Sequence, residues 1–304
     1  MTGTATDEAG PLPGRVGGRA AVIGAGTMGI GIAHALAAAG VATVVVEPDR
    51  AQADGVRPAI DAVLADGVDR ARISPKDAAA ALARVAVVPS VDDLEDGLDL
   101  VVESVPESEP LKRSVLAAAE ARHPGLLATN TSSLSVTALA AGLAHPDRLC
   151  GMHFFNPVWA LRLVEVVRTA TTSDATLAAA LGWVERLGKE AAVVHDAPGF
   201  ATSRLDLCLA LEAIRMVEEQ VADPAHIDRA VRLAYRHPVG PLELSDIVGL
   251  DVRLDIARSL AASLGPRYAP PQLLEDLVRA GRLGKKTGRG FYDWSTAEPA
   301  TPAE

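Results

Sequence analysis

The chain has 304 residues, 49% of them hydrophobic but only 3% aromatic, and its 39 acidic residues against 29 basic ones give a net charge of −10. A chain of this length forms one large domain or two modest ones, with enough apolar residues for a sizeable core. The acidic balance argues against nonspecific nucleic-acid binding, which needs a basic surface, so an anionic ligand would require a local basic pocket.

The N-terminal segment, residues 1–18, has no apolar targeting stretch and is predicted to be a disordered lead-in. No run of about 18 apolar residues follows, so no membrane span is expected. The two cysteines, Cys150 and Cys208, fit no metal-ligand spacing, and each lies in an apolar run. This predicts two buried free thiols, no metal site and a cytoplasmic protein.

From residue 19 to 196, apolar strands alternate with helical stretches. The strand RAAVI runs into a glycine turn and an Ala-rich helix, and the strand VATVVVE precedes a helical region over 49–83 with a break near Ser74. Further strands are predicted at RVAVV, LDLVVESV, GLLATNT, RLCGMHF, LRLVEVV and EAAVVHD, with helices over 109–122 and 173–187 among them. This alternation is typical of an α/β fold with a doubly wound, mostly parallel sheet that helices cover on both faces.

After residue 196 the pattern changes, and no convincing strand appears between 201 and 281. Helical spacing covers 203–221, 224–235, 249–264 and 271–281. The tail GRLGKKTGRGFYDW is expected to be a loop anchored by Phe291, Tyr292 and Trp294. We therefore expect one domain over 19–196 and an all-helical second domain over 197–304.

The sequence GAGTMG, residues 24–29, is a GxGxxG motif between a strand and a helix. Gly24 permits the tight turn, Gly26 lets a pyrophosphate approach the backbone, and Gly29 lets helix and strand pack closely. The helix N-terminus at Thr27 and Met28 offers N–H groups and the positive end of a dipole to phosphates. The motif predicts a Rossmann-type dinucleotide site, and a glycine turn that only packs is the alternative.

Glu47 ends the second strand at the spacing expected of a ribose-binding acid. Its carboxylate can accept from both hydroxyls of an adenosine ribose and would repel a 2′-phosphate, which favours NAD over NADP. Arg50 lies close in the sequence and blunts this preference. NAD is therefore the predicted cofactor.

The strands GMHFF and LVEVV each carry one ionisable side chain, His153 and Glu165. In an antiparallel hairpin centred on residue 159, these side chains face each other with Cβ atoms about 5 Å apart. A carboxylate there fixes the tautomer of a histidine and stabilises its protonated form, as a general base requires. A register slip of one residue would separate them, and a purely structural pair is the alternative. The nucleotide motif favours the base, because oxidising a secondary alcohol needs both a proton acceptor and a hydride acceptor.

Several blocks together resemble the L-3-hydroxyacyl-CoA dehydrogenase family in sequence and order, from about residue 19 to 294: GAGTMGIGIA, TNTSSLS, GMHFFNP, LVEVV, APGF, HPVGPLELSDIVGLD and GKKTGRGFYDW. The resemblance implies a Rossmann-type NAD domain and a helical domain that forms a homodimer. It also implies NAD-dependent oxidation of an L-3-hydroxyacyl-CoA of short chain, such as 3-hydroxybutyryl-CoA. The implied partner is an acyl-CoA substrate, with no nucleic acid and no membrane.

The resemblance also implies roles for single residues. It makes His153 the catalytic base with Glu165 as its partner, and Ser132 matches a hydroxyl that hydrogen-bonds the reacting oxygen. Asn130 and Asn156 match positions near the nicotinamide ribose.

Glu107 and Lys112 match positions that contact the nicotinamide half of the cofactor, although a solvated helix charge is the alternative for Lys112. One position departs from the family, which reads PGF, two small residues and then Asn-Arg. This chain reads PGFATSR, with Ser203 at the asparagine position. Serine can still donate toward the substrate but is shorter, which puts substrate positioning in doubt.

The residues that hold CoA are less defined. Arg57 and Arg70 are candidates, and Arg282, Lys285 and Lys286 could instead meet phosphates. Two other functions remain open at this point: the same hydride transfer on hydroxyadipyl-CoA or on a non-CoA hydroxy acid of the sugar-acid or carnitine type, and a nucleotide-binding protein without turnover.

Overall fold

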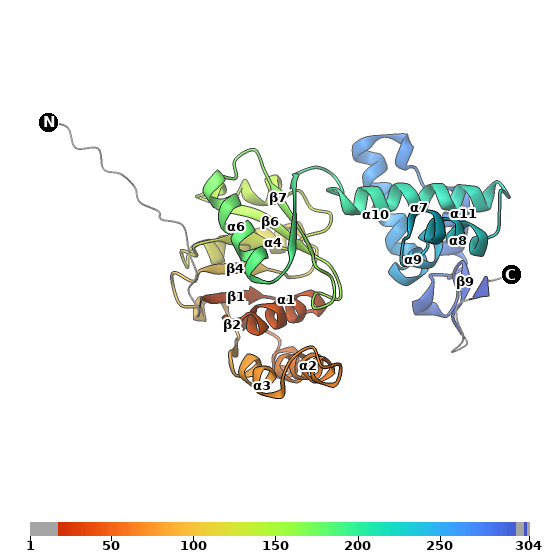
Figure 1. Ribbon diagram of the computed structural model, residues 1–304. Coiled ribbons are helices and arrows are strands. Elements are labelled where there is room, and N and C mark those ends of the chain that lie inside the picture. The colour runs from red at the N-terminus through yellow and green to blue at the C-terminus, as the bar shows by residue number, and fades with distance from the viewer. Residues whose placement is uncertain (1–17, 296–300, 303–304) are drawn as a thin grey trace. The chain divides into compact units, whose positions relative to one another are not determined.

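The computed structural model describes residues 18–295 and 301–302, so the predicted lead-in lies outside the described residues except for Gly18. The chain divides into two compact units between Asp196 and Ala197, and each unit is described by itself (Figure 1). Within the described ranges, no helix is long and apolar enough to cross a membrane.

The first unit is built on an eight-stranded sheet with the order β3-β2-β1-β4-β5-β6-β7-β8. Its strands are β1 (Arg19–Ile23), β2 (Ala42–Val46), β3 (Val85–Val88), β4 (Leu100–Glu103), β5 (Leu127–Thr129), β6 (Leu149–Phe154), β7 (Leu163–Arg168) and β8 (Glu190–His195). All neighbours pair in parallel except β6 and β7, which form an antiparallel hairpin. The predicted α/β fold with a mostly parallel sheet is confirmed.

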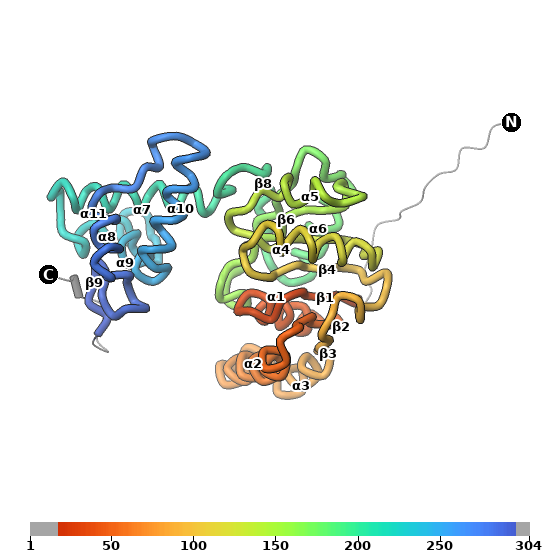
Figure 2. The backbone as a smooth tube through the Cα atoms, turned by 180° about the vertical axis from the view of Figure 1, so that it is seen from behind, coloured from red at the N-terminus to blue at the C-terminus, as the bar shows by residue number. Residues whose placement is uncertain are grey.

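Helices cover both faces of this sheet. They are α1 (Thr27–Ala38), α2 (Arg50–Asp69), α3 (Pro75–Ala83), α4 (Glu109–Glu120), α5 (Val136–Ala140) and α6 (Asp174–Arg186), with 3₁₀ turns at Val91–Asp93 and Pro146–Arg148. The helices α1 and α6 share one apolar cluster with the sheet, and α4 and α5 lie over the other face (Figure 2). Consequently β4 and β6 are buried at every residue, which explains why their sequences are apolar except for Glu103 and His153.

The helical region predicted over 49–83 is two helices. Ser74 ends the connection between α2 and α3, because its hydroxyl accepts from the N–H of Asp77 and Pro75 occupies the first helical position. The short helix α5 has no counterpart among the predicted elements.

The second unit is helical apart from one short pair of strands. It contains α7 (Thr202–Glu218), α8 (Pro224–Tyr235), α9 (Pro241–Val248), α10 (Leu250–Leu264) and α11 (Gln272–Arg279), with 3₁₀ turns at Pro266–Tyr268 and Lys285–Thr287. The strands β9 (Tyr292–Asp293) and β10 (Thr301–Pro302) pair antiparallel. The sequence predicted α7, α8, α10 and α11, whereas α9 was missed.

The glycine-rich tail is held by one buried carboxylate. Asp246, on α9, is 0% exposed and accepts from the backbone N–H of Phe291 and Tyr292 and from the indole N–H of Trp294 at 3.0, 2.8 and 2.9 Å. A Cβ at Gly290 would lie 2.1 Å from an oxygen of Asp246, so only glycine fits there. Phe291 and Tyr292 are buried, which confirms the expected aromatic anchor.

A second buried carboxylate starts α9. Gly240, at the N-cap, has no side chain to cap the helix, and Asp228 from α8 accepts from the N–H groups of Leu242 and Glu243 at 2.9 and 2.8 Å. Asp228 also accepts from the hydroxyl of Tyr292 at 2.8 Å, and burial followed by this hydrogen bond raises the pKa of Tyr292. A helix flanked by proline and glycine thus begins because another helix supplies its cap.

The prediction of two buried thiols is right for Cys150 and wrong for Cys208. Cys150 lies in β6, where burial raises the pKa of its thiol to about 12. Cys208 is exposed on α7, whereas its neighbour Leu207 is buried. The apolar run around Cys208 forms a helix, and such a run places residues on the outward face as well as the inward one.

Candidate active site

The candidate residues of the first unit gather at one edge of the sheet. Because β1, β2, β4, β5 and β6 run in parallel, their carboxyl ends meet there, and the strand order reverses between β1 and β4. Ligands of such sheets bind at this switch point. The glycine turn follows β1, Glu47 follows β2, Glu103 ends β4, Asn130 follows β5, and His153 lies near the end of β6.

The three motif glycines meet different surroundings. Gly24 has a φ of +104°, and a Cβ there would lie 2.7 Å from the carbonyl oxygen of Ser104. A Cβ at Gly29 would lie 1.9 Å from the carbonyl oxygen of Gly24, so this position requires glycine for packing. A Cβ at Gly26 would meet nothing within 4 Å. Gly24 and Gly29 therefore serve the fold, whereas the bare backbone at Gly26 faces open space.

The N-terminus of α1 offers unused donors at this space. Gly26 is the N-cap and supplies no side-chain cap. Within the described part of the chain, the N–H groups of Thr27, Met28 and Gly29 have no hydrogen-bond partner. Three free N–H groups at the positive end of a helix dipole fit a pyrophosphate.

Glu47 lies beside the glycine turn and is 8% exposed. One of its oxygens accepts from the N–H of Ala25 at 2.9 Å and the other from the N–H of Asp49 at 3.0 Å. Each oxygen keeps a lone pair for a ribose hydroxyl. The side chain of Arg50, which blunted the preference for NAD in sequence, is 94% exposed, and its Nε lies 3.9 Å from Asp54 Oδ2. The residues present therefore fit NAD.

The predicted pairing of His153 with Glu165 is confirmed. The two residues are direct partners across the β6–β7 hairpin, and His153 Nδ1 lies 2.8 Å from Glu165 Oε2. Both are buried, at 7% and 0% exposed. The carboxylate therefore fixes the orientation of the ring at the sheet edge, and the role of the ring as a base stays a prediction.

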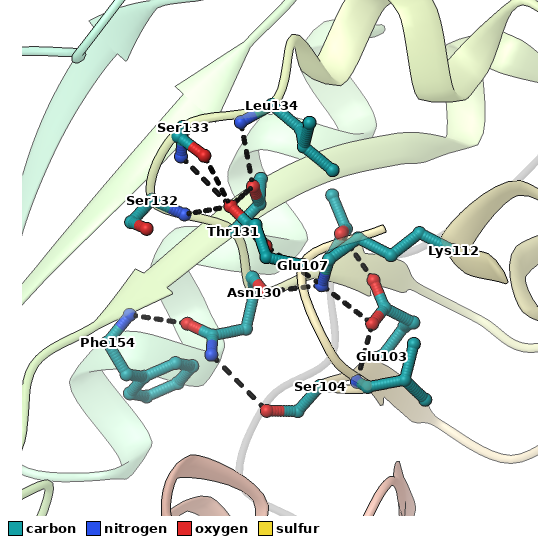
Figure 3. A network of polar contacts seen from close by, with 12 residues as sticks. Glu103, Ser104, Glu107, Lys112, Asn130, Thr131, Ser132, Ser133, Leu134 and Phe154 are labelled. Atoms are coloured by element: carbon teal, nitrogen blue, oxygen red, sulfur yellow. Dashed lines mark hydrogen bonds and ion pairs between the residues drawn. The ribbon is translucent and has the colours of Figure 1, made fainter. Parts of the chain in front are cut away.

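Lys112 is fully buried, which excludes a solvated helix charge (Figure 3). Its ammonium donates to Glu103 Oε1 at 2.8 Å and to the carbonyl oxygen of Asn130 at 2.9 Å, and it lies 3.5 Å from Glu107 Oε2. Burial raises the pKa of Glu103, and this ammonium together with the hydroxyl of Thr129 partly offsets the rise. In this structure Lys112 holds protein oxygens in place and does not itself reach the surface.

Glu107 holds the loop that carries Ser132. Its Oε1 accepts from the hydroxyl of Thr131 at 2.6 Å, from the N–H groups of Ser132 and Ser133 at 3.1 Å each, and from the hydroxyl of Ser133 at 2.9 Å. Burial acts to raise the pKa of Glu107, but these hydrogen bonds and the charge of Lys112 outweigh it and lower the pKa. Ser132 is exposed, and its hydroxyl makes no hydrogen bond within the described residues (Figure 3).

Asn130 links three strand ends. Its side-chain oxygen accepts from the N–H of Phe154 at 3.0 Å, and its amide nitrogen donates to the hydroxyl of Ser104 at 3.3 Å. Asn130 therefore fixes the backbone next to His153. Asn156 is exposed at the start of the β6–β7 turn, where its peptide bond to proline is cis.

Sequence reasoning missed Lys189, which holds this turn. Its ammonium donates to the carbonyl oxygens of Val158 and Leu161 at 2.5 and 2.7 Å, and burial lowers its pKa. Nothing near Lys189 in the sequence signals this role, because β7 and α6 separate it in the chain from the turn that it contacts. Asp196, which directly follows β8, was also missed.

Ser203 lies in the first turn of α7 in the second unit, whereas His153 belongs to the first unit.

The basic side chains that were candidates for CoA contact other residues of this chain. Arg57 donates to the carbonyl oxygens of Leu82 and Val85, and Arg70 pairs with Asp66. The others contact the tail and α10: Arg282 with Gly290, Lys285 with Trp294 and Lys286 with Asp251. Among the described residues, no group of His, Cys, Asp or Glu is arranged to hold a metal ion.

Two family models match the chain. The NAD binding domain of 3-hydroxyacyl-CoA dehydrogenase matches residues 19–197, and the C-terminal domain of 3-hydroxyacyl-CoA dehydrogenase matches residues 199–294. Together they span nearly all of the described chain.

Individual relatives agree with these matches. A 3-hydroxybutyryl-CoA dehydrogenase of Bradyrhizobium diazoefficiens is 41% identical over 91% of this chain and 96% of its own length. The crystal structure of (S)-3-hydroxybutyryl-CoA dehydrogenase from Ralstonia eutropha has a TM-score of 0.87 at 38% identity, covering 91% of this chain and 99% of that one. A 3-hydroxyadipyl-CoA dehydrogenase of Escherichia coli is 37% identical over 92% of this chain but 60% of its own length.

Proposed function

The chain belongs to the 3-hydroxyacyl-CoA dehydrogenase family, and from this premise we propose that it interconverts an L-3-hydroxyacyl-CoA and the 3-ketoacyl-CoA with NAD. The relatives above favour a short acyl group such as 3-hydroxybutyryl. The observation that carries the proposal is the 2.8 Å contact between His153 and Glu165 at the sheet edge where the glycine turn also lies. A positioned base beside a dinucleotide site is the minimum that alcohol oxidation requires.

NAD supplies the hydride acceptor when it is bound. The N–H groups of Thr27 and Met28 hold the pyrophosphate, and the bare backbone at Gly26 lets it approach. Glu47 accepts from the ribose hydroxyls with its remaining lone pairs and repels a 2′-phosphate. These roles are supported by the open space at Gly26 and by the unused donors of α1.

Asn130 and Asn156 are assigned to the nicotinamide ribose. Glu107 is assigned to the same half of the cofactor, and Lys112 acts behind it by holding its second oxygen at 3.5 Å. The buried position of Lys112 supports a positioning role over direct contact.

His153 takes the proton of the substrate hydroxyl. Because Nδ1 contacts Glu165, Nε2 is the nitrogen assigned to this proton. Glu165 stabilises the imidazolium that forms and keeps the ring in one orientation. Ser132 and Ser203 orient the substrate oxygens, and Ser203 reaches less far than the asparagine that the family has at this position.

The test follows NADH absorbance at neutral pH with acetoacetyl-CoA, with NADPH as the cofactor control. We expect His153→Ala to lower kcat by about 10²- to 10⁴-fold while NADH binding is retained. His145→Ala, at an exposed histidine outside the sheet edge, is the matched control and should keep normal turnover. Near-normal activity of His153→Ala would overturn the assignment of the base.

Hydroxyadipyl-CoA is the second candidate substrate, favoured by the 37% identity to the Escherichia coli relative. A substrate panel of acetoacetyl-CoA, 3-ketoadipyl-CoA and free 3-keto acids separates the candidates. Preference for a free acid would contradict the CoA substrate, and NADH binding without any turnover would contradict the enzyme.

We also propose a cytoplasmic homodimer formed through the second unit. The most exposed large apolar residues, Leu205, Val221, Leu233 and Tyr235 at 60–75%, all belong to that unit. The cytoplasmic location is supported by the two free cysteines. Light scattering after size exclusion distinguishes a dimer from a monomer.

A further inference from the structure

Asp196 directly follows β8 and is the last residue of the first unit. Its carboxylate reaches α5, which lies 60 residues earlier in the chain. One oxygen accepts from the hydroxyl of Ser135 and the N–H of Thr137, both at 2.8 Å, and the other accepts from the N–H of Val136 at 3.2 Å. Ser135, the N-cap, uses the same hydroxyl to accept from the N–H of Ala138 at 3.2 Å.

These contacts satisfy the first three N–H groups of α5, which have no partner inside the helix. The helix has five residues and is too short to be stable by itself. Its start is therefore fixed by a carboxylate from another part of the sheet. A negative charge at this end also suits the helix dipole.

The loop before α5 carries Ser132 and is held at both ends. Glu107 binds its first half through Thr131, Ser132 and Ser133, and Asp196 binds the residues that end it. The hydroxyl of Ser132 makes no hydrogen bond within the described residues, so its position depends on the backbone alone. Backbone position in turn depends on the two carboxylates.

We propose that Asp196 is a positioning residue that fixes the hydroxyl of Ser132 through the N-terminus of α5. This inference rests on the proposed function, in which Ser132 orients the reacting oxygen. Asp196 also begins the segment that leads into α7 and Ser203.

The test is a double-mutant cycle in the full-length chain. Asp196→Ala should lower kcat for acetoacetyl-CoA by about tenfold, because three hydrogen bonds at the start of α5 are lost, and should leave NADH binding unchanged. In a Ser132→Ala background the same change should cost less than about twofold, since Asp196 acts only through Ser132. Asp223→Ala, which removes the comparable cap of α8, is the matched control and should lower kcat by less than about twofold in either background.

Equal losses from Asp196→Ala in both backgrounds would overturn the positioning role, because they indicate a general structural effect. Unaltered kcat in Asp196→Ala would overturn it as well. Hydrogen exchange of the backbone amides of residues 130–140 provides a readout that does not need turnover. Unchanged protection of these amides in Asp196→Ala would contradict the role of Asp196 in fixing the start of α5. Absence of wild-type turnover, or full activity of Ser132→Ala, would instead contradict the proposed function.

Discussion

Each unit contains a network of carboxylates, and only the network of the first unit includes an ion pair among the described residues. In the first unit, Glu103 and Glu107 share the buried ammonium of Lys112. In the second unit, Asp228 and Asp246 accept from backbone amides and aromatic side chains. The first network ends on a loop with an exposed serine hydroxyl, whereas the second closes on α9 and the tail. A buried ion pair therefore underlies the loop of Ser132, where Glu107 also accepts from N–H groups, whereas within the described part of the chain the network of the second unit uses N–H and O–H donors alone.

Lys112→Met is the strongest way to break the first network. The buried carboxylate of Glu103 would lose its cation, and breaking such a buried pair destabilises a protein by about 3–5 kcal/mol. Urea denaturation of the variant measures this loss. Arg70→Met, which removes an exposed ion pair with Asp66, is the control and should cost no more than about 1 kcal/mol. A similar small loss in both variants would show that the buried cation is not needed.

Asp246→Ala tests the second network and should cost about 3 kcal/mol, because three donors lose their acceptor in a buried region. Intrinsic fluorescence should report exposure of Trp294 in the same variant. Asp251→Ala is the matched control in the same unit, since its partner Lys286 is exposed, and should cost about 0.5 kcal/mol or less. A folded tail with unchanged fluorescence in Asp246→Ala would contradict the anchor.

The smallest expected effect is on the pH dependence of stability, which should differ between the two networks. The pKa of Glu107 is below its ordinary value of 4.5, so its contribution to stability is present above that pH and is lost as the pH falls through the folded-state pKa. Burial raises the pKa of Asp246 above 3.8, so its contribution is present below 3.8 and is lost as the pH rises through the folded-state pKa. Tm should fall less steeply on acidification in Glu107→Gln than in wild type, and more steeply in Asp246→Asn. Each Tm is expressed relative to the Tm of the same variant at pH 7. Equal slopes of Tm against pH in the two variants would contradict the difference between the networks.

The sequence was sufficient where an interaction follows from strand register or from a local motif. The hairpin centred on residue 159 placed His153 opposite Glu165 because side chains alternate along strands and one face must be shared. The glycine turn was predictable because its spacing, flanking strand and helix all agree. These features depend on residues that are close in the chain.

The sequence was insufficient where a short helix depends on a distant cap. Both α5 and α9 were missed. The first N–H groups of α5 donate to the carboxylate of Asp196, and those of α9 donate to the carboxylate of Asp228. The local sequence of such a helix contains no complete start signal, since the missing acceptor is supplied by tertiary structure. The burial of Lys112 was missed for a similar reason, because an ammonium on an amphipathic helix looks the same in sequence whether it meets solvent or two acids.

The complete enclosure of Lys112 has a consequence for chemical labelling. An amine-reactive reagent reaches exposed lysines such as Lys76 directly, but it meets Lys112 only when this part of the fold opens. The rate at which Lys112 is labelled therefore reports how often the opening occurs. Acetyl transfer to this lysine in a cell would likewise mark molecules that had opened, so the modification would record a history of unfolding.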